Sequence, residues 1–288
     1  MHIFTVKAFM ASLKDIKNRI KGVKSTQKIT KAMKMISTAR LNKAKIALGV
    51  TSQYSNSMQN FVESLLETVD LQEIESKIPF IQNAIGKNVA RKKMVVVFTT
   101  DKGLCGALNT LILREFESSF EKNDLIYVVG KKGFDYTKPR HKMYNRNVIL
   151  SSKCSSGEIS QDIISTIINE NITDIKVIFP HFVSTMVQKP TSTFLPKLEK
   201  NANKGFFEID ECPAQLLENA MKCYLDAMFS RCLAELICCE HSARMIAMDN
   251  ATNNAKVKIN ALTLTYNKTR QANITREILE IISGSQAV

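Results

Sequence analysis

The sequence predicts two long terminal helices that form an antiparallel coiled coil, with a small, mainly parallel α/β domain inserted between them. Three observations lead to this fold class. From Ser12 to Val69 the chain is interrupted only by Gly22 and Gly49. The last region begins at Pro213, a favourable first helical position, and then contains no Gly or Pro until Gly284. Between them, short apolar runs alternate with helical patterns, as in α/β domains.

The apolar residues of the first region follow helical spacing. Leu13, Ile16, Ile20 and Val23 are separated by steps of 3, 4 and 3. After a shift in phase, the pattern predicts that the buried seam continues through Ile29, Met33 and Ile36 and then through a later stripe: Tyr54, Met58, Phe61, Leu65 and Val69. We therefore assign residues 11–69 to the first helix of a coiled-coil shaft.

Basic residues are concentrated in this first helix. Between Ser12 and Leu48 there are eleven Lys or Arg and one acid, Asp15, so this segment holds +10 of the net charge of +13. Seven like-charge pairs then fall three or four positions apart, and at roughly 0.3 kcal/mol each they cost on the order of 2 kcal/mol. An acidic partner would offset this repulsion. Nucleic acid, an anionic membrane surface and a protein with acidic loops all carry the required charge.

The C-terminal region, 211–284, predicts the second helix of the shaft. Its apolar seam repeats in steps of four and three over three heptads: Leu225, Phe229, Cys232, Leu236, Cys239, Ala243 and Ile246. Asn250 and Asn253 occupy the next seam positions, which predicts a curved coil with a polar interruption. Seventy helical residues span roughly 105 Å, whereas a globule of this chain length is roughly 50 Å across. The helix must therefore protrude.

The central region, 90–200, predicts an inserted Rossmann-like α/β domain. Strands are expected at 94–100, 125–130, 147–150 and 174–183, and helices at 107–121 and 158–169. Residues 184–196 predict a further strand or hairpin. Alternation of this kind is typical of a mainly parallel sheet with helices on its faces.

Composition narrows the class of protein. No window approaches 18 consecutive apolar residues, and the first nine residues are too short for a secretory signal, so we expect no membrane span and no signal peptide. The seven cysteines are an odd number, and five lie in the C-terminal helix region. Free thiols in a reducing compartment are therefore expected, without a disulfide framework.

Two motifs resemble ligand sites only weakly. The run TTDKGLCGALN connects a strand to a helix, where phosphates often bind, but Gly103 and Gly106 fit neither a dinucleotide nor a P-loop fingerprint. A tight turn is the favoured interpretation. Cys232, Cys238, Cys239 and His241 would suit zinc by residue type, but one helix cannot gather all four into a tetrahedron. We therefore expect no metal site and no cofactor.

No catalytic constellation stands out. Neither a paired-carboxylate motif nor a nucleophile with an adjacent base accompanies the four histidines: His2, His141, His181 and His241. Two other classes stay open as alternatives. A basic coiled coil that binds nucleic acid would show a steep salt dependence. A small α/β enzyme would require a ligand at the turn from Asp101 to Asn109.

Four separate stretches, in order, resemble the gamma subunits of the rotary ATP synthases. They are IKNRIKGVKSTQKITKAMKMISTARLNKA, TTDKGLCGALN, STMVQKPT, and ARMIAMDNATNNA followed by LTLTYNKTRQANITREILEIISGSQAV. The resemblance covers nearly everything from Ala11 onward, which makes Met10 a candidate start.

The resemblance implies a fold and a set of partners. In that family the two terminal helices form the shaft inside a ring of three alpha and three beta subunits. The α/β domain lies below it, near an epsilon-type subunit and the membrane c-type ring. One copy per complex is implied, with no nucleic acid. The matching positions implied to contact the ring are Lys28, Lys31, Met33, Lys34, Arg244, Arg270, Gln271 and Thr275.

The implied function is that of the rotor, or central stalk. Such a subunit couples ion flow through the membrane ring of a proton-translocating ATP synthase to ATP synthesis at the alpha/beta ring, and it regulates ATPase activity without a catalytic site of its own. The implied location is the cytoplasmic face of a bacterial inner membrane, with the matrix side of the mitochondrial inner membrane as the alternative. Because no long Arg-rich presequence is present, the bacterial location is favoured.

Overall fold

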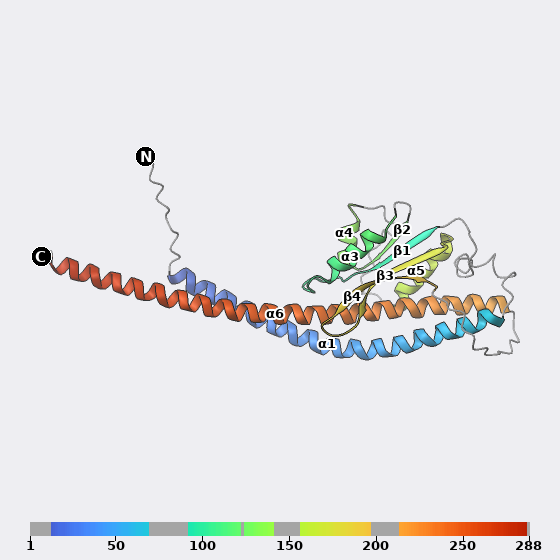
Figure 1. Ribbon diagram of the computed structural model, residues 1–288, viewed down its shortest axis with the longest axis horizontal. Coiled ribbons are helices and arrows are strands. Elements are labelled where there is room, and N and C mark those ends of the chain that lie inside the picture. Colours follow the sequence, from blue (N-terminus) through green and yellow to red (C-terminus); the bar gives the residue numbers. More distant parts are fainter. Residues whose placement is uncertain (1–12, 69–91, 122–123, 141–155, 197–212, 287–288) are drawn as a thin grey trace. The chain divides into compact units, whose positions relative to one another are not determined.

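Two long helices frame the chain in the computed structural model (Figure 1). They are α1, Leu13–Thr68, and α6, Pro213–Gln286. The structure describes five segments: 13–68, 92–121, 124–140, 156–196 and 213–286.

The chain divides into two compact units. The first unit consists of Met1–Ile36 with Ile246–Val288, and the second consists of Ser37–Met245. Both long helices contribute to each unit. The domain bounds predicted from the sequence patterns stay a prediction; they are 11–69, 90–200 and 211–284.

The two helices are antiparallel in both units, as predicted. In the first unit Thr30 Oγ1 lies 2.8 Å from Thr252 Oγ1, and Lys34 Nζ lies 2.6 Å from Asp249 Oδ1. From Thr30 to Lys34 the residue number rises along α1, whereas the contacted residues of α6 run in the opposite direction, from Thr252 to Asp249. In the second unit the same sense holds, because Leu41 and Ala44 pack with Cys238, whereas Ser55 Oγ donates to Met228 Sδ.

The buried side of α1 is a regular heptad seam without the predicted shift. The phase set by Leu13 continues along the whole helix in steps of three and four. Its buried or half-buried members are Leu13, Ile16, Ile20, Val23, Gln27, Thr30, Lys34, Ser37, Leu41, Ala44, Leu48, Thr51, Ser55, Met58, Val62 and Leu65. The prediction that Ile29 and Ile36 belong to the seam is wrong, because these side chains are 58% and 54% exposed. Small and polar residues occupy the middle of the seam instead.

The seam of α6 in the first unit also differs from the prediction. Asn250 and Asn253 are exposed rather than buried. The buried or half-buried positions are Met248, Thr252, Ala255, Ile259, Leu262 and Tyr266, again in steps of four and three. The face of α6 toward α1 keeps one phase, because Cys238, which packs with Leu41 and Ala44, lies two heptads before Thr252. The polar residue in this seam is Thr252 rather than an asparagine.

The sheet of the second unit has the order β2-β1-β3-β4. β1 is Lys93–Phe98, β2 is Leu125–Val129, β3 is Asp174–Phe182 and β4 is Gln188–Leu195. β1 is parallel to β2 and β3, and β4 pairs antiparallel with β3. The predicted strand at 147–150 lies outside the described residues. The other strand predictions are confirmed, including the hairpin that ends in β4.

Successive side chains of β1 point to opposite faces of the sheet, and both faces are buried. Met94, Val96 and Phe98 of β1 pack against α5, Ser156–Asn169, and against α6. Val95 and Val97 pack on the opposite face against α3, Leu108–Ser119. This alternation gives two apolar layers, and α6 contributes residues to both. The sheet is consequently fixed to the shaft helix by a continuous core.

The short helix α4, Lys131–Thr137, was not predicted. Its seven residues follow β2 directly and are too few to establish a helical period. Two glycines permit the tight connection. A side chain at Gly130, where φ is +96°, would bring its Cβ within 2.0 Å of the Thr99 carbonyl oxygen, and a Cβ at Gly133 would lie 2.6 Å from Thr99 Oγ1. Among the described residues, no helix combines the length and apolar character needed to cross a bilayer.

Candidate functional site

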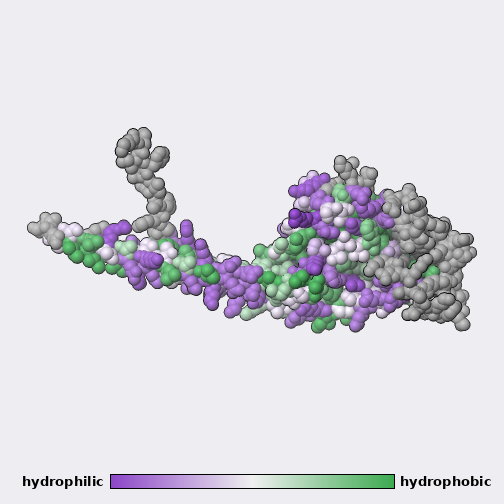
Figure 2. Space-filling view, viewed as in Figure 1, coloured by the Kyte–Doolittle hydropathy of each residue, from purple (hydrophilic) through white to green (hydrophobic). Residues whose placement is uncertain are grey.

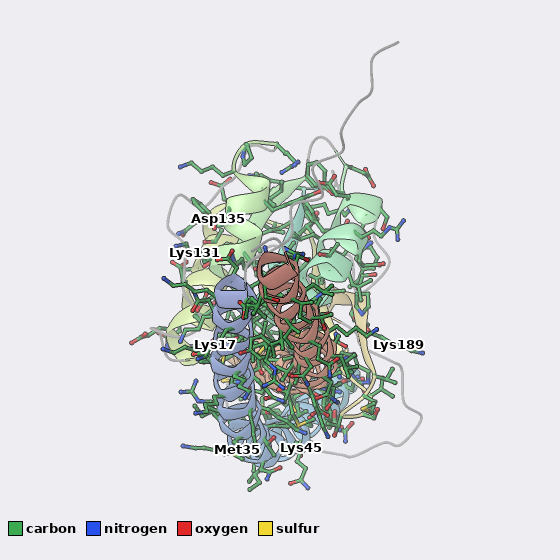
Figure 3. The ribbon with its side chains drawn as sticks, turned by 90° about the vertical axis from the view of Figure 1, so that its left-hand side faces the viewer. Lys17, Met35, Lys45, Lys131, Asp135 and Lys189 are labelled. Carbon is green, nitrogen blue, oxygen red and sulfur yellow. The ribbon has the colours of Figure 1, made fainter. Side chains whose placement is uncertain are left out.

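The first candidate surface is the basic side of α1 in the first unit. Lys28 and Lys31 are exposed, Met33 is half-buried, and Lys34 is half-buried and paired with Asp249. Lys17 lies farther toward the start of the same helix (Figure 3). Of the four predicted contact residues of α1, Lys28 and Lys31 are therefore accessible to solvent. Lys34 instead forms an ion pair with α6 across the seam.

Exposed apolar side chains accompany these lysines. Ile29, Ile36 and Met35 are 58%, 54% and 61% exposed, and Met35 is labelled in Figure 3. Large apolar side chains beside exposed cations are typical of a contact surface rather than of a solvated helix face. We call Lys28, Ile29, Lys31, Met35 and Ile36 the neck surface.

Sequence reasoning missed the apolar part of the neck surface. Ile29, Met33 and Ile36 have helical spacing, so they matched a seam. Extending the phase of Leu13 without a shift would have placed Thr30 inside and Ile29 outside. That phase was the signal that could have found the surface.

The second candidate surface is the C-terminal end of α6. Arg270, Gln271 and Thr275 are exposed there. In the register set by Thr30 with Thr252, Leu13 lies opposite about position 270, so roughly the last 16 residues of α6, or about 24 Å, extend past the first residue of α1. Several apolar side chains are exposed on this end: Ile274, Ile278, Leu279, Ile281 and Ile282. Figure 2 shows green, apolar surface toward this end of α6, beside a mostly polar stretch.

Arg244, which was also predicted to contact a partner, is buried within the second unit. Its Nη2 lies 2.5 Å from Glu240 Oε1 and 3.2 Å from the Gly103 carbonyl oxygen, to which Nε also donates at 3.4 Å. Only 10% of the side chain is exposed. Arg244 thus fastens the turn after β1 to α6 within the second unit. Its predicted partner contact stays a prediction.

The turn after β1 uses its own polar groups internally. Asn109 Oδ1 accepts from the Thr100 backbone N–H at 3.1 Å, and Asn109 Nδ2 donates to Thr100 Oγ1 at 2.7 Å. Asp101 Oδ1 accepts from the Lys131 backbone N–H at 3.1 Å. The backbone N–H groups of Thr100 and Lys131, at the ends of β1 and β2, are therefore engaged by side chains of the protein itself. The geometry supports the tight-turn interpretation of TTDKGLCGALN.

Three cationic side chains surround His241. Burial, and then the charges of Arg244, Arg40 and Lys102, lower the pKa of His241 to about 4. The imidazole is therefore neutral at pH 7, and its buried Nδ1 has no hydrogen-bond partner among the described residues. These cations come from α6, α1 and the turn after β1, which meet at this point.

The cysteines of α6 behave as core residues. Cys232, Cys238 and Cys239 are buried. Burial raises the pKa of the Cys238 thiol to about 11 and raises the pKa values of the Cys232 and Cys239 thiols still more. Within the described part of the chain, no group of three or more His, Cys, Asp or Glu side chains could hold a metal ion.

Comparisons with known proteins give a consistent result. A family model described as ATP synthase matches residues 12–288. The ATP synthase gamma chain of Geobacter metallireducens is 34% identical over 97% of this chain and 99% of its own length. That of Bdellovibrio bacteriovorus is 33% identical over the same shares.

Solved structures share the fold. A chain in the mitochondrial ATP synthase of Euglena gracilis (OSCP/F1/c-ring, rotational state 3) superposes with a TM-score of 0.69 at 22% identity, covering 96% of this chain and 94% of that one. A chain in the rotor of the same enzyme gives 0.64 at 21% identity, covering 91% and 98%.

Proposed function

Because this chain belongs to the family of ATP synthase gamma chains, we propose that its neck surface and the exposed end of α6 are where it contacts the catalytic ring. The chain is a non-catalytic subunit of ATP synthase and forms the rotor of its central stalk. It couples ion flow through the membrane ring to ATP synthesis at sites on other subunits. The family assignment gives the nucleic-acid alternative no support.

The partners follow from the same assignment. The rotor interacts with the alpha and beta subunits, an epsilon-type subunit and the c-type ring, and the complex is associated with a membrane. We infer that it lies on the cytoplasmic face of a bacterial inner membrane, since the relatives named above are bacterial. The matrix side of the mitochondrial membrane stays the alternative, because the structural neighbours come from mitochondrial enzymes.

The observation that carries the proposal is the composition of the neck surface. The charge of a lysine attracts an acidic loop at long range and without close packing. Ile29 and Ile36 add only a small apolar contact. A rotor must pass three equivalent partners without being held strongly by one of them. Long-range charge attraction with limited apolar burial meets this requirement better than a large hydrophobic interface.

The polar middle of the seam supports the same function. Thr30 and Thr252 meet across the helix pair. The opposite side of α1 carries exposed lysines together with the exposed Ile29 and Ile36. An axle with unlike sides presents a different face to each of three identical subunits. At any moment the three identical subunits around the axle are therefore in different states. For the predicted contact residues beyond α1, the exposure of Arg270, Gln271 and Thr275 at the end of α6 is compatible with this role.

Reconstitution with alpha and beta subunits tests the proposal. We expect Lys28→Glu with Lys31→Glu to reduce the ATPase activity of the assembled complex at least fivefold, because reversed charges repel the acidic loops. Ile29→Ala with Ile36→Ala should lower it less. Lys131→Glu with Lys189→Glu is the control with the same change in charge, since both side chains are exposed elsewhere, on α4 and β4 (Figure 3). Equal loss in the control and the neck variant would overturn the assignment of this surface.

A further inference from the structure

The β3–β4 hairpin is tied to α6 by polar side chains on one face of that helix. Glu235, Cys239 and Ser242 are separated by steps of four and three, so they lie in one row along α6. All three are buried. Each makes a hydrogen bond with a backbone group of the hairpin, and all of these contacts lie within the second unit.

Glu235 is the centre of this row. Its Oε2 lies 2.6 Å from His181 Nδ1 and accepts from the Phe182 backbone N–H at 3.2 Å. Its Oε1 accepts from Arg231 Nε at 3.2 Å, and Arg231 Nη1 donates to Asn56 Oδ1 of α1 at 3.1 Å. The carboxylate side chain is 3% exposed. One buried carboxylate thus joins the end of β3 to both long helices.

Ser242 holds the tip of the hairpin. Its Oγ donates to the Thr185 carbonyl oxygen at 2.5 Å and accepts from Gln188 Nε2 at 3.2 Å. From α1, Lys45 Nζ donates to Thr185 Oγ1 at 3.1 Å and lies 5.5 Å from the centre of the Phe182 ring. Between these two points, Cys239 Sγ donates to the Pro180 carbonyl oxygen at 3.4 Å.

These contacts differ in kind from the apolar core under the sheet. Apolar packing is not directional, so it resists separation of two elements more than it resists sliding between them. Hydrogen bonds from fixed backbone groups to a buried carboxylate depend on distance and angle, and those to a charged acceptor are the stronger ones. The row therefore fixes the direction of the hairpin relative to α6 as well as its distance.

We propose that Glu235 and Ser242 are positioning residues that make the β3–β4 hairpin and α6 turn as one body. Torque applied to the α/β part of the rotor then reaches the shaft helix through this row. The inference rests on the proposed rotor function, because torque has to pass between these parts only in a rotor. Neither side chain needs to contact a nucleotide or a partner subunit for this role.

The test compares pumping with hydrolysis in the complete enzyme. Inverted membrane vesicles carrying the reconstituted complex are supplied with ATP, and proton uptake is divided by ATP hydrolysed. We expect Glu235→Gln with Ser242→Ala to lower this ratio at least twofold, because a glutamine amide cannot accept from both His181 and Arg231. The matched control is Glu218→Gln with Ser165→Ala. Glu218 pairs with Lys222 on its own helix, and Ser165 Oγ donates within its own helix, to the Asp162 carbonyl oxygen.

The outcomes separate the two proposals. If vesicles with the unaltered chain fail to pump, the rotor assignment fails before the positioning role of Glu235 and Ser242 is tested. If they pump and the double variant keeps the unaltered ratio at equal assembly, the positioning role is wrong. A purely structural role would lower assembly and hydrolysis together and leave the ratio unchanged, so that result also counts against it. Should the double variant not assemble, Ser242→Ala alone, which keeps the carboxylate, must still lower the ratio.

Amide hydrogen exchange gives a readout independent of activity. In the isolated chain, Glu235→Gln should speed exchange at the Phe182 amide at least tenfold, since this amide donates directly to the carboxylate. Amides of the central strand, such as Val96, should be unaffected. Equal exchange at Phe182 in both proteins would contradict the proposed positioning role of Glu235.

Discussion

Lys34 and Asp249 form an ion pair across the antiparallel helices, with Nζ 2.6 Å from Oδ1. Lys34 occupies a seam position in α1, one turn from the hydrogen-bonded Thr30 and Thr252. A lysine in a coiled-coil seam favours one register over others but contributes little to stability. This pair therefore selects the alignment of the two helices at the point where the apolar seam is weakest.

A double-mutant cycle measures the strength of this pair. The side chains are 40% and 43% exposed, so solvent screening limits the coupling between Lys34→Met and Asp249→Asn to about 1 kcal/mol or less. Urea unfolding of the four proteins gives the value. The reversed pair, Lys34→Asp with Asp249→Lys, should recover most of the stability lost in either single reversal. A coupling above 2 kcal/mol would show that the pair is effectively buried.

Stability should fall in mild acid because of His241. Its pKa is about 4 in the folded chain against an ordinary value of 6.5, so the unfolded chain binds the proton first as the pH falls. Above pH 6.5 the imidazole is neutral in both states and the free energy of unfolding is at its full value. Between pH 6.5 and pH 4 the free energy of unfolding decreases progressively, by no more than about 3 kcal/mol in total.

The variant His241→Gln isolates this effect, since it cannot be protonated. Urea midpoints at pH 7 and pH 4.5 should differ less for the variant than for the unaltered chain. Arg40, Lys102 and Arg244 are retained in both proteins, so the difference reports the histidine alone. Parallel pH profiles would show that the imidazole is not held neutral.

The sequence predicted elements whose pattern is local. The strands β1, β2 and β3 were located to within one or two residues, because each is an apolar run bounded by polar turns. The middle of the α1 seam was missed because burial there follows the phase of distant residues. Gln27, Thr30, Lys34 and Ser37 are polar or small, so hydropathy favoured the neighbouring Ile29 and Ile36.

The candidate site was predictable only in part. The exposure of Lys28 and Lys31 follows from their charge. The burial of Arg244 was not predicted. Glu240, four residues earlier on the same helix, accounts for one of its acceptors, but the other is a backbone carbonyl of a distant turn. The row at Glu235 leaves no local signal, because its partners are backbone groups some 50 to 60 positions away.

Two glycines should respond in opposite ways to alanine. Gly130→Ala would bring Cβ within 2.0 Å of the Thr99 carbonyl oxygen at a φ of +96°, so we expect destabilisation of about 3 kcal/mol or more. Gly22→Ala, at an exposed position in the first third of α1, meets nothing within 4 Å and should stabilise the chain by about 0.5–1 kcal/mol. Thermal denaturation followed by circular dichroism distinguishes them. A neutral Gly130→Ala would mean that the connection from β2 to α4 is not as tight as described.

Thiol reactivity should separate the cysteines of α6 by burial. Cys223 is exposed, whereas Cys238 is buried and its pKa is raised to about 11, which leaves almost no thiolate at pH 7. With a chromogenic disulfide reagent, Cys223→Ser should remove about one equivalent from the fast phase. Cys238→Ser should leave that phase unchanged and lower only the total measured after unfolding in guanidinium chloride. A fast phase that shrinks in Cys238→Ser would show that the helix pair around Leu41 and Ala44 opens readily, because those side chains cover the thiol.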